Sequence, residues 1–80
     1  MDPAYEWLVR YHLARSEIGR AAFWRREQQR TFVGPAEGVR WLQQESERLS
    51  AAAATRGQAV EAPPDFPARE FAPAGRAQGR

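Results

Sequence analysis

The 80-residue sequence lacks cysteine and lysine, and it contains a single histidine. Without cysteine, neither a disulfide nor a thiolate metal site can brace the chain. A single core in a chain of this size seldom supplies more than about 3–5 kcal/mol, and small scaffolds usually gain the rest from staples or partners. Because the staples are absent, we expect a protein partner or an oligomer, and we predict a homo-oligomer or a subunit of a multi-protein complex.

Long apolar runs are also absent. No stretch approaches the roughly 18 apolar residues of a membrane-spanning helix, and the opening MDPAYEWL has no basic segment followed by an apolar one. The sequence therefore predicts neither a membrane segment nor a signal peptide, and we expect a protein that stays in the compartment where it is made.

The arginines are numerous but not arranged for nucleic acid. Ten acidic residues offset the twelve arginines and leave a net charge of +2, a weak field for a polyanion. One run places an arginine at every fifth position, and five residues turn a helix by about 140° net, which scatters these side chains around the helix. Nucleic-acid binding is therefore a minor alternative. The run comprises Arg10, Arg15, Arg20, Arg25 and Arg30.

Two helices are predicted over the first 57 residues. Asp2 followed by Pro3 is typical of a helix start, and the pattern predicts one helix over residues 3–29, with Gly19 as its weak point. A second helix is predicted over residues 35–56, ending at Gly57. The short link between them predicts an antiparallel hairpin. The predicted class is all-α, with a helical hairpin domain at 1–57 and an extended tail at 58–80.

Apolar residues spaced alternately by three and four define the predicted seam between the helices. In this arrangement Ile18 meets Leu42, and Tyr11 approaches Leu49. The seam consists of Trp7, Tyr11, Ile18, Val39, Leu42 and Leu49.

A second apolar strip lies nearly opposite that seam on the first helix. One partner helix cannot cover both strips, which indicates a helix held between subunits, and tryptophan and tyrosine are prominent at interfaces. The predicted interface residues of the helical domain are Val9, Leu13, Phe23, Trp24 and Trp41.

The tail QAVEAPPDFPAREFAPAGRAQGR is too rich in proline for a helix or a central strand. Acid–phenylalanine pairs recur at Asp65-Phe66 and Glu70-Phe71. One interpretation is a solvated tail, and the other is a peptide that docks on a partner through Phe66 and Phe71.

No constellation in the sequence indicates an enzyme. His12 precedes Ser16 by one helical turn, but this pair has neither an orienting acid nor an oxyanion hole. The glutamates of the second helix form no inward-facing metal box, and the glycines are too dispersed for a phosphate loop. We therefore expect no catalytic residue, metal or cofactor.

The segment RTFVGPAEGVRWLQQESERL resembles the second half of the lambda-type head–tail joining protein W family, in residues 30–49. The shared features are Phe32 and Val33, the cap Gly34-Pro35-Ala36-Glu37, and the leucine-spaced helix that follows. The resemblance implies an alternative fold, a small α-β-β-α unit with a β-hairpin over residues 21–33. It also implies a ring of subunits between a phage portal and its tail.

These observations predict a non-catalytic structural or interaction subunit of a larger assembly, in particular a connector-type component of a phage head–tail joint, either cytoplasmic or virion-associated. Two alternatives remain open. One is a small phage-type adaptor or inhibitor that binds a host protein, and the other is a small DNA-binding regulator with a partner-binding tail.

Overall fold

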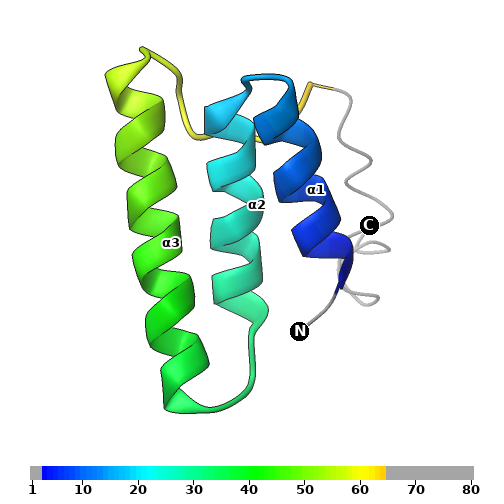
Figure 1. Ribbon diagram of the computed structural model, residues 1–80, viewed down its shortest axis with the longest axis vertical. Helices are drawn as coiled ribbons and strands as arrows, with labels where there is room; N and C mark the ends of the chain where they lie inside the picture. The colour runs from blue at the N-terminus through cyan, green and yellow to red at the C-terminus, as the bar shows by residue number, and fades with distance from the viewer. Residues whose placement is uncertain (1–2, 65–80) are drawn as a thin grey trace, which may run out of the picture.

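The computed structural model describes residues 3–64, which form three α-helices (Figure 1). They are α1 (Pro3–Ala14), α2 (Ile18–Thr31) and α3 (Ala36–Thr55). Residues 3–64 contain no strand, so the predicted all-α class is confirmed. The two-helix hairpin is wrong in its first half, where two helices replace the expected one. The alternative α-β-β-α fold is also wrong, because α2 occupies most of the segment 21–33 in which it placed a β-hairpin.

The three helices lie side by side with α2 in the middle, and successive helices run in opposite directions (Figure 1). The extents are 38 × 32 × 18 Å. The two outer helices each pack against α2 and hardly contact each other. The fold is therefore a single layer of helices. The segment 58–63 then passes behind α2 and α1 (Figure 1).

The chain reverses at residues 15–17, where the sequence predicted continuous helix. Ser16 adopts a left-handed conformation, with φ of 61°. The Ser16 amide donates to the Leu13 carbonyl at 3.0 Å, and the Glu17 amide donates to the His12 carbonyl at 2.9 Å. These two bonds form a Schellman motif, the usual end of an α-helix, with serine where glycine is common. The break therefore comes at Ser16 rather than at Gly19.

The Glu17 carboxylate holds this turn together. Its Oε1 lies 2.8 Å from Nδ1 of His12 and accepts from Nε of Arg15 at 3.4 Å, while Oε2 accepts from Nη1 of Arg20 at 3.2 Å. The bond with His12 lowers the pKa of Glu17, and the charges of Arg15 and Arg20 act in the same direction. A left-handed conformation costs a non-glycine residue about 1–2 kcal/mol, and these contacts offset part of that cost.

Gln58 secures the same turn from the far end of the fold. Its Nε2 donates to the main-chain carbonyl of Ser16 at 3.0 Å, and its Oε1 accepts from the Gly19 amide at 2.9 Å. A side chain at residue 19 would collide with the carbonyl of Ala59. Gly19 thus allows the segment after α3 to lie directly against the start of α2.

The core between α1 and α2 is small. Val9, Ala21, Ala22 and Trp24 form a buried cluster together with Leu49, and half-buried apolar residues surround it. The predicted interface strip was wrong for Val9 and Trp24. Because α1 folds back onto α2, the two side chains are buried inside one chain and do not reach a partner.

Helix α3 follows the predicted spacing more closely. Leu42, Ser46, Leu49 and Ala53 are its buried residues and lie along one side. Val39, the first predicted member of that row, lies near the start of α3 and is exposed. The periodicity therefore identified the buried side of α3 correctly but extended it too far toward the helix start.

Replacing Ser16 by glycine should increase the free energy of unfolding by about 1 kcal/mol, because glycine adopts the left-handed conformation without steric cost. The converse substitution Gly57→Ala, at φ of 71°, should lower it by a similar amount. Urea denaturation measures both. A destabilised Ser16→Gly variant would contradict the proposed role of the turn.

Candidate interaction surfaces

One broad surface of the helical layer carries the side chain of Arg25, and we call it the front face. Residues seven apart on a helix share a side, so α1 and α2 each contribute a pair of positions to this face, and α3 contributes a pair and the neighbouring Glu45. The front face contains Glu6 and Leu13 of α1, Ile18 and Arg25 of α2, and Trp41, Glu45 and Arg48 of α3.

A single guanidinium group connects all three helices at the centre of the front face. Arg25 is only 4% exposed. Its Nη1 donates to Oε1 of Glu6 at 2.9 Å and to Oε1 of Gln28 at 2.8 Å. Its Cζ lies 5.1 Å from the ring centre of Trp41, a cation–π distance. The arginine therefore ties α1 to α2 by an ion pair and α2 to α3 through the indole ring.

Charges of opposite sign alternate across this face. The hydrogen bond from Arg25 lowers the pKa of Glu6, and the positive charges of Arg25 and Arg10 lower it further. On α3, the hydrogen bond from Arg48 lowers the pKa of Glu45. Both carboxylates are thus held in their charged form. Around them, Leu13 and Trp41 leave 36% and 42% of their surfaces exposed.

The outer edge of α1, opposite α2, carries a second surface, which we call the aromatic ladder. It consists of Trp7, Tyr11 and Arg15, spaced four residues apart. The Trp7 and Tyr11 rings stack with centroids 5.3 Å apart and an interplanar angle of 11°, and Cζ of Arg15 lies 5.4 Å from the Tyr11 ring centre. Trp7 is 62% exposed. The expectation that Trp7 and Tyr11 pack in the helix seam was wrong, because the reversal at Ser16 turns this side of α1 outward.

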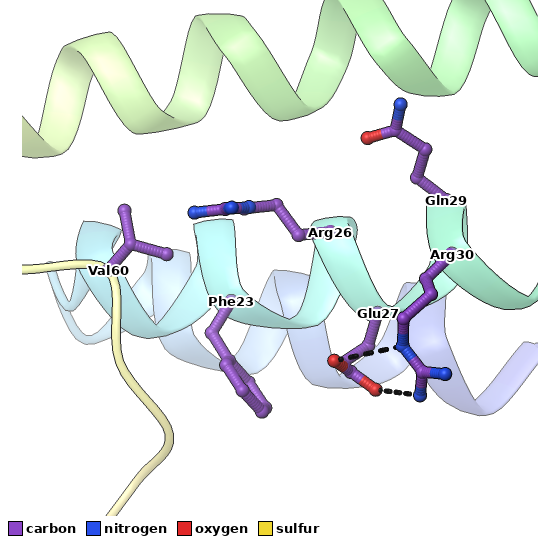
Figure 2. Close-up of a pocket in the computed structure, with 6 residues that line it drawn as sticks. All are labelled: Phe23, Arg26, Glu27, Gln29, Arg30 and Val60. Carbon is purple, nitrogen blue, oxygen red and sulfur yellow. Dashed lines mark hydrogen bonds and ion pairs between the residues drawn. The ribbon is translucent and has the colours of Figure 1, made fainter.

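The back face has a shallow hollow between α2 and the segment after α3 (Figure 2). The space measures about 530 Å³. Glu27 and Arg30 form an ion pair at its rim, at 2.6 Å, and the Phe23 ring points away from Arg26 (Figure 2). The hollow is lined by Phe23, Arg26, Glu27, Gln29, Arg30 and Val60. Its lining offers hydrophobic contact and charge but no nucleophile–base pair.

The sole histidine has a carboxylate partner that sequence reasoning missed. His12 is buried and its Nδ1 lies 2.8 Å from Glu17. An imidazole oriented by a carboxylate is one component of a catalytic triad, but here the bond closes the turn at the end of α1. Within residues 3–64, no three histidine, cysteine or acidic side chains gather closely enough to hold a metal ion.

The remaining predicted residues fall in different places. Leu13 and Trp41 lie on the front face as exposed side chains, whereas Phe23 is half-buried on the back face. Ile18 is half-buried at the start of α2. Phe66 and Phe71 lie outside the described residues. No described helix is long and apolar enough to cross a membrane.

The bond between Glu6 and Arg25 should contribute more stability than a surface ion pair. Removing one partner of a buried pair costs about 3–5 kcal/mol, and because Glu6 is partly exposed we expect about 1–2 kcal/mol for Glu6→Gln. The matched control is Glu27→Gln, whose partner Arg30 is largely exposed, with an expected loss below about 0.5 kcal/mol. Equal losses in urea denaturation would contradict the central role of Arg25.

Acid should weaken the fold through the same carboxylates. Glu6, Glu17 and Glu45 have folded-state pKa values below their ordinary value of 4.5. Their contribution is therefore complete above the unfolded-state pKa and is lost as pH falls through the lower folded-state pKa. The melting temperature should be steady from pH 7 to about 5 and fall below pH 4.5. The decrease should be smaller in Glu6→Gln.

Six described arginines lie beside acids whose negative charge opposes the approach of a phosphate, and the net charge of the chain is only +2. We expect only weak retardation of random duplex DNA in a gel shift at low salt, since affinity depends on the phosphates neutralised. Tight binding that persists at 200 mM salt would contradict this expectation. The paired arginines are Arg10, Arg15, Arg20, Arg25, Arg30 and Arg48.

Comparisons of the chain with protein-family models, with curated proteins and with solved structures gave no match.

Proposed function

We propose that the protein is a non-catalytic interaction subunit, and that its front face packs against another subunit of a larger assembly. The observation that carries the proposal is the single-layer architecture (Figure 1). Domains are usually built from two or more layers that enclose a core between them. A one-layer fold lacks the second layer, and a partner would supply it.

The composition of the core supports this proposal. Within residues 3–64, three of the seven buried apolar residues are alanines, which bury little surface each; the seven are Val9, Ala21, Ala22, Trp24, Leu42, Leu49 and Ala53. Meanwhile Leu13 and Trp41 remain partly exposed on the front face. Burying one such side chain fully is worth roughly 1.5–3 kcal/mol relative to water. Since only 36% and 42% of these two side chains is still exposed, covering them would add about 1–2 kcal/mol, which is still useful to a small domain.

A second copy of the chain is the partner that we propose for the front face. Most soluble oligomers are symmetric assemblies of identical subunits, and two-fold dimers are the commonest. The front face alternates arginine and glutamate across the helices, with Glu6 and Glu45 between arginines. A surface with both signs of charge can place its own arginines against its own glutamates after a two-fold rotation.

Light scattering on the full chain tests the association. The monomer mass is 9.1 kDa, and we expect a larger mass at concentrations of tens of micromolar. Replacing Leu13 and Trp41 together by serine should shift the mass toward the monomer, with circular dichroism showing that the helices are retained. The control Gln44→Ser, on an exposed part of α3, should leave the mass unchanged.

A wild-type chain that stays at the monomer mass, with the same stability as the Leu13 and Trp41 variant, would contradict the proposal. In that case the front face would be ordinary solvated surface.

From the resemblance we propose a phage head–tail joint as an alternative form of the assembly, a ring in which the front face would contact the neighbouring subunit head to tail and not across a two-fold axis. The support is the resemblance of residues 30–49, which include the proline-capped start of α3 at Pro35 and Ala36. The β-hairpin implied by the resemblance is not present, so its support is confined to that segment. Antibody labelling of purified particles should place the protein at the neck. Its absence from the particles would contradict this form and favour an adaptor or inhibitor that binds a host protein.

A further inference from the structure

We propose that the aromatic ladder is a binding site for the proline-rich segment of the same chain, residues 62–73, APPDFPAREFAP. The ladder lies at the outer edge of α1 and not on the front face, so this proposal does not depend on the proposed association. The proposed contact lies within one subunit, and it involves the part of the tail that contains the acid–phenylalanine pairs.

The ladder has the geometry of a preorganised platform. The stacked rings of Trp7 and Tyr11 are nearly parallel, and Arg15 extends the row beyond Tyr11. Eight residues of helix span about 12 Å, which is the length of the row. Within residues 3–64 no other helix packs against this edge, since α1 meets α2 on its opposite side. The rings therefore present a fixed apolar strip to a ligand.

The chemistry of the segment suits such a strip. Aromatic surfaces bind proline-rich peptides in the polyproline II conformation, which has three residues per turn and a low cost of ordering. With this period, Pro64, Pro67, Glu70 and Pro73 share one side of the peptide. The prolines would contact the rings, Glu70 would face Arg15 at the end of the row, and Asp65 would supply negative charge from a neighbouring side.

The flanks of the ladder carry the complementary charge. The side chains of Arg10 and Arg15 are 78% and 57% exposed, and their contacts with glutamates are long, at 3.5 Å and 3.4 Å. Exposed ion pairs of this kind contribute little, so both guanidinium groups can turn toward another carboxylate at small cost. The acids at positions 65 and 70 belong to the proline-rich segment itself and would supply such carboxylates.

The described backbone ends on the side of α1 that faces away from α2 (Figure 1). After α3 the chain crosses behind α2, where Val60 packs against the core, and its last described residues lie beyond α1 (Figure 1). From Pro64 to Pro73 a polyproline II segment spans about 28 Å, more than twice the length of the ladder. A short tether gives an effective concentration in the millimolar range, so even a weak contact would be populated.

Paramagnetic relaxation in the full chain tests the contact. Because the sequence has no cysteine, Ala68→Cys provides a single site for a nitroxide label. We expect the indole N–H signal of Trp7 to lose more than half of its intensity. The signal of Trp41, on α3 at the other edge of the layer, should keep most of its intensity. A tether alone could also bring the label near α1, so the matched control adds Pro64→Ala and Pro67→Ala to the labelled chain.

In the control variant the Trp7 signal should recover by at least twofold. Equal broadening with and without the prolines would overturn the proposal, because proximity along the chain would then explain the effect. A mixed sample shows whether the broadening arises within one chain or between two chains. It combines nitroxide-labelled chain without ¹⁵N and ¹⁵N-enriched chain without the nitroxide. Full broadening of Trp7 in the mixture would overturn the intramolecular contact and assign the segment to a second copy. Light scattering on the Leu13 and Trp41 variant reports on the front face separately.

Discussion

The reversal of the chain at Ser16 is the constraint on which the rest of the structure depends. Because residues 15–17 end one helix and start the next, α1 folds back beside α2. This return buries Val9 against Trp24 and brings Glu6 within 2.9 Å of Arg25. It also turns Trp7 outward. A continuous helix would have placed Glu6 some 28 Å from Arg25, at about 1.5 Å per residue.

Arg25 then explains how so small a core holds three helices in one plane. An arginine that is only 4% exposed would be costly if it were unpaired. Here its charge is matched by Glu6, and its flat group is covered by Trp41. The polar centre thus fixes the relative positions of the helices, a task that the alanine-rich contacts of α2 perform with little specificity.

The sequence predicted the helical class, the start of α3 near Pro35 and its buried residues Leu42 and Leu49, since both capping chemistry and periodicity are local signals. It did not predict the reversal. The apolar spacing runs without interruption through residues 7–18, and a serine in the left-handed conformation leaves no mark in the sequence, whereas Gly57 does. The partnership of Glu6 with Arg25 joins residues 19 positions apart and follows only from the reversal. Trp7 and Tyr11 were predicted to pack in the seam, and their exposed side of the helix and their alignment with Arg15 were not predicted.

The two hydrogen bonds of Gln58 with Ser16 and Gly19 have a consequence for folding during synthesis. The α1–α2 turn receives its last two hydrogen bonds from a residue about 40 positions later in the chain. During synthesis the first two helices therefore emerge with an unfinished turn, and they stay in that state until α3 is complete. Contacts between distant parts of a chain form late in folding. Until then the turn lacks its contacts with Gln58, and Leu49 of α3 has not yet joined the cluster of Val9 and Trp24.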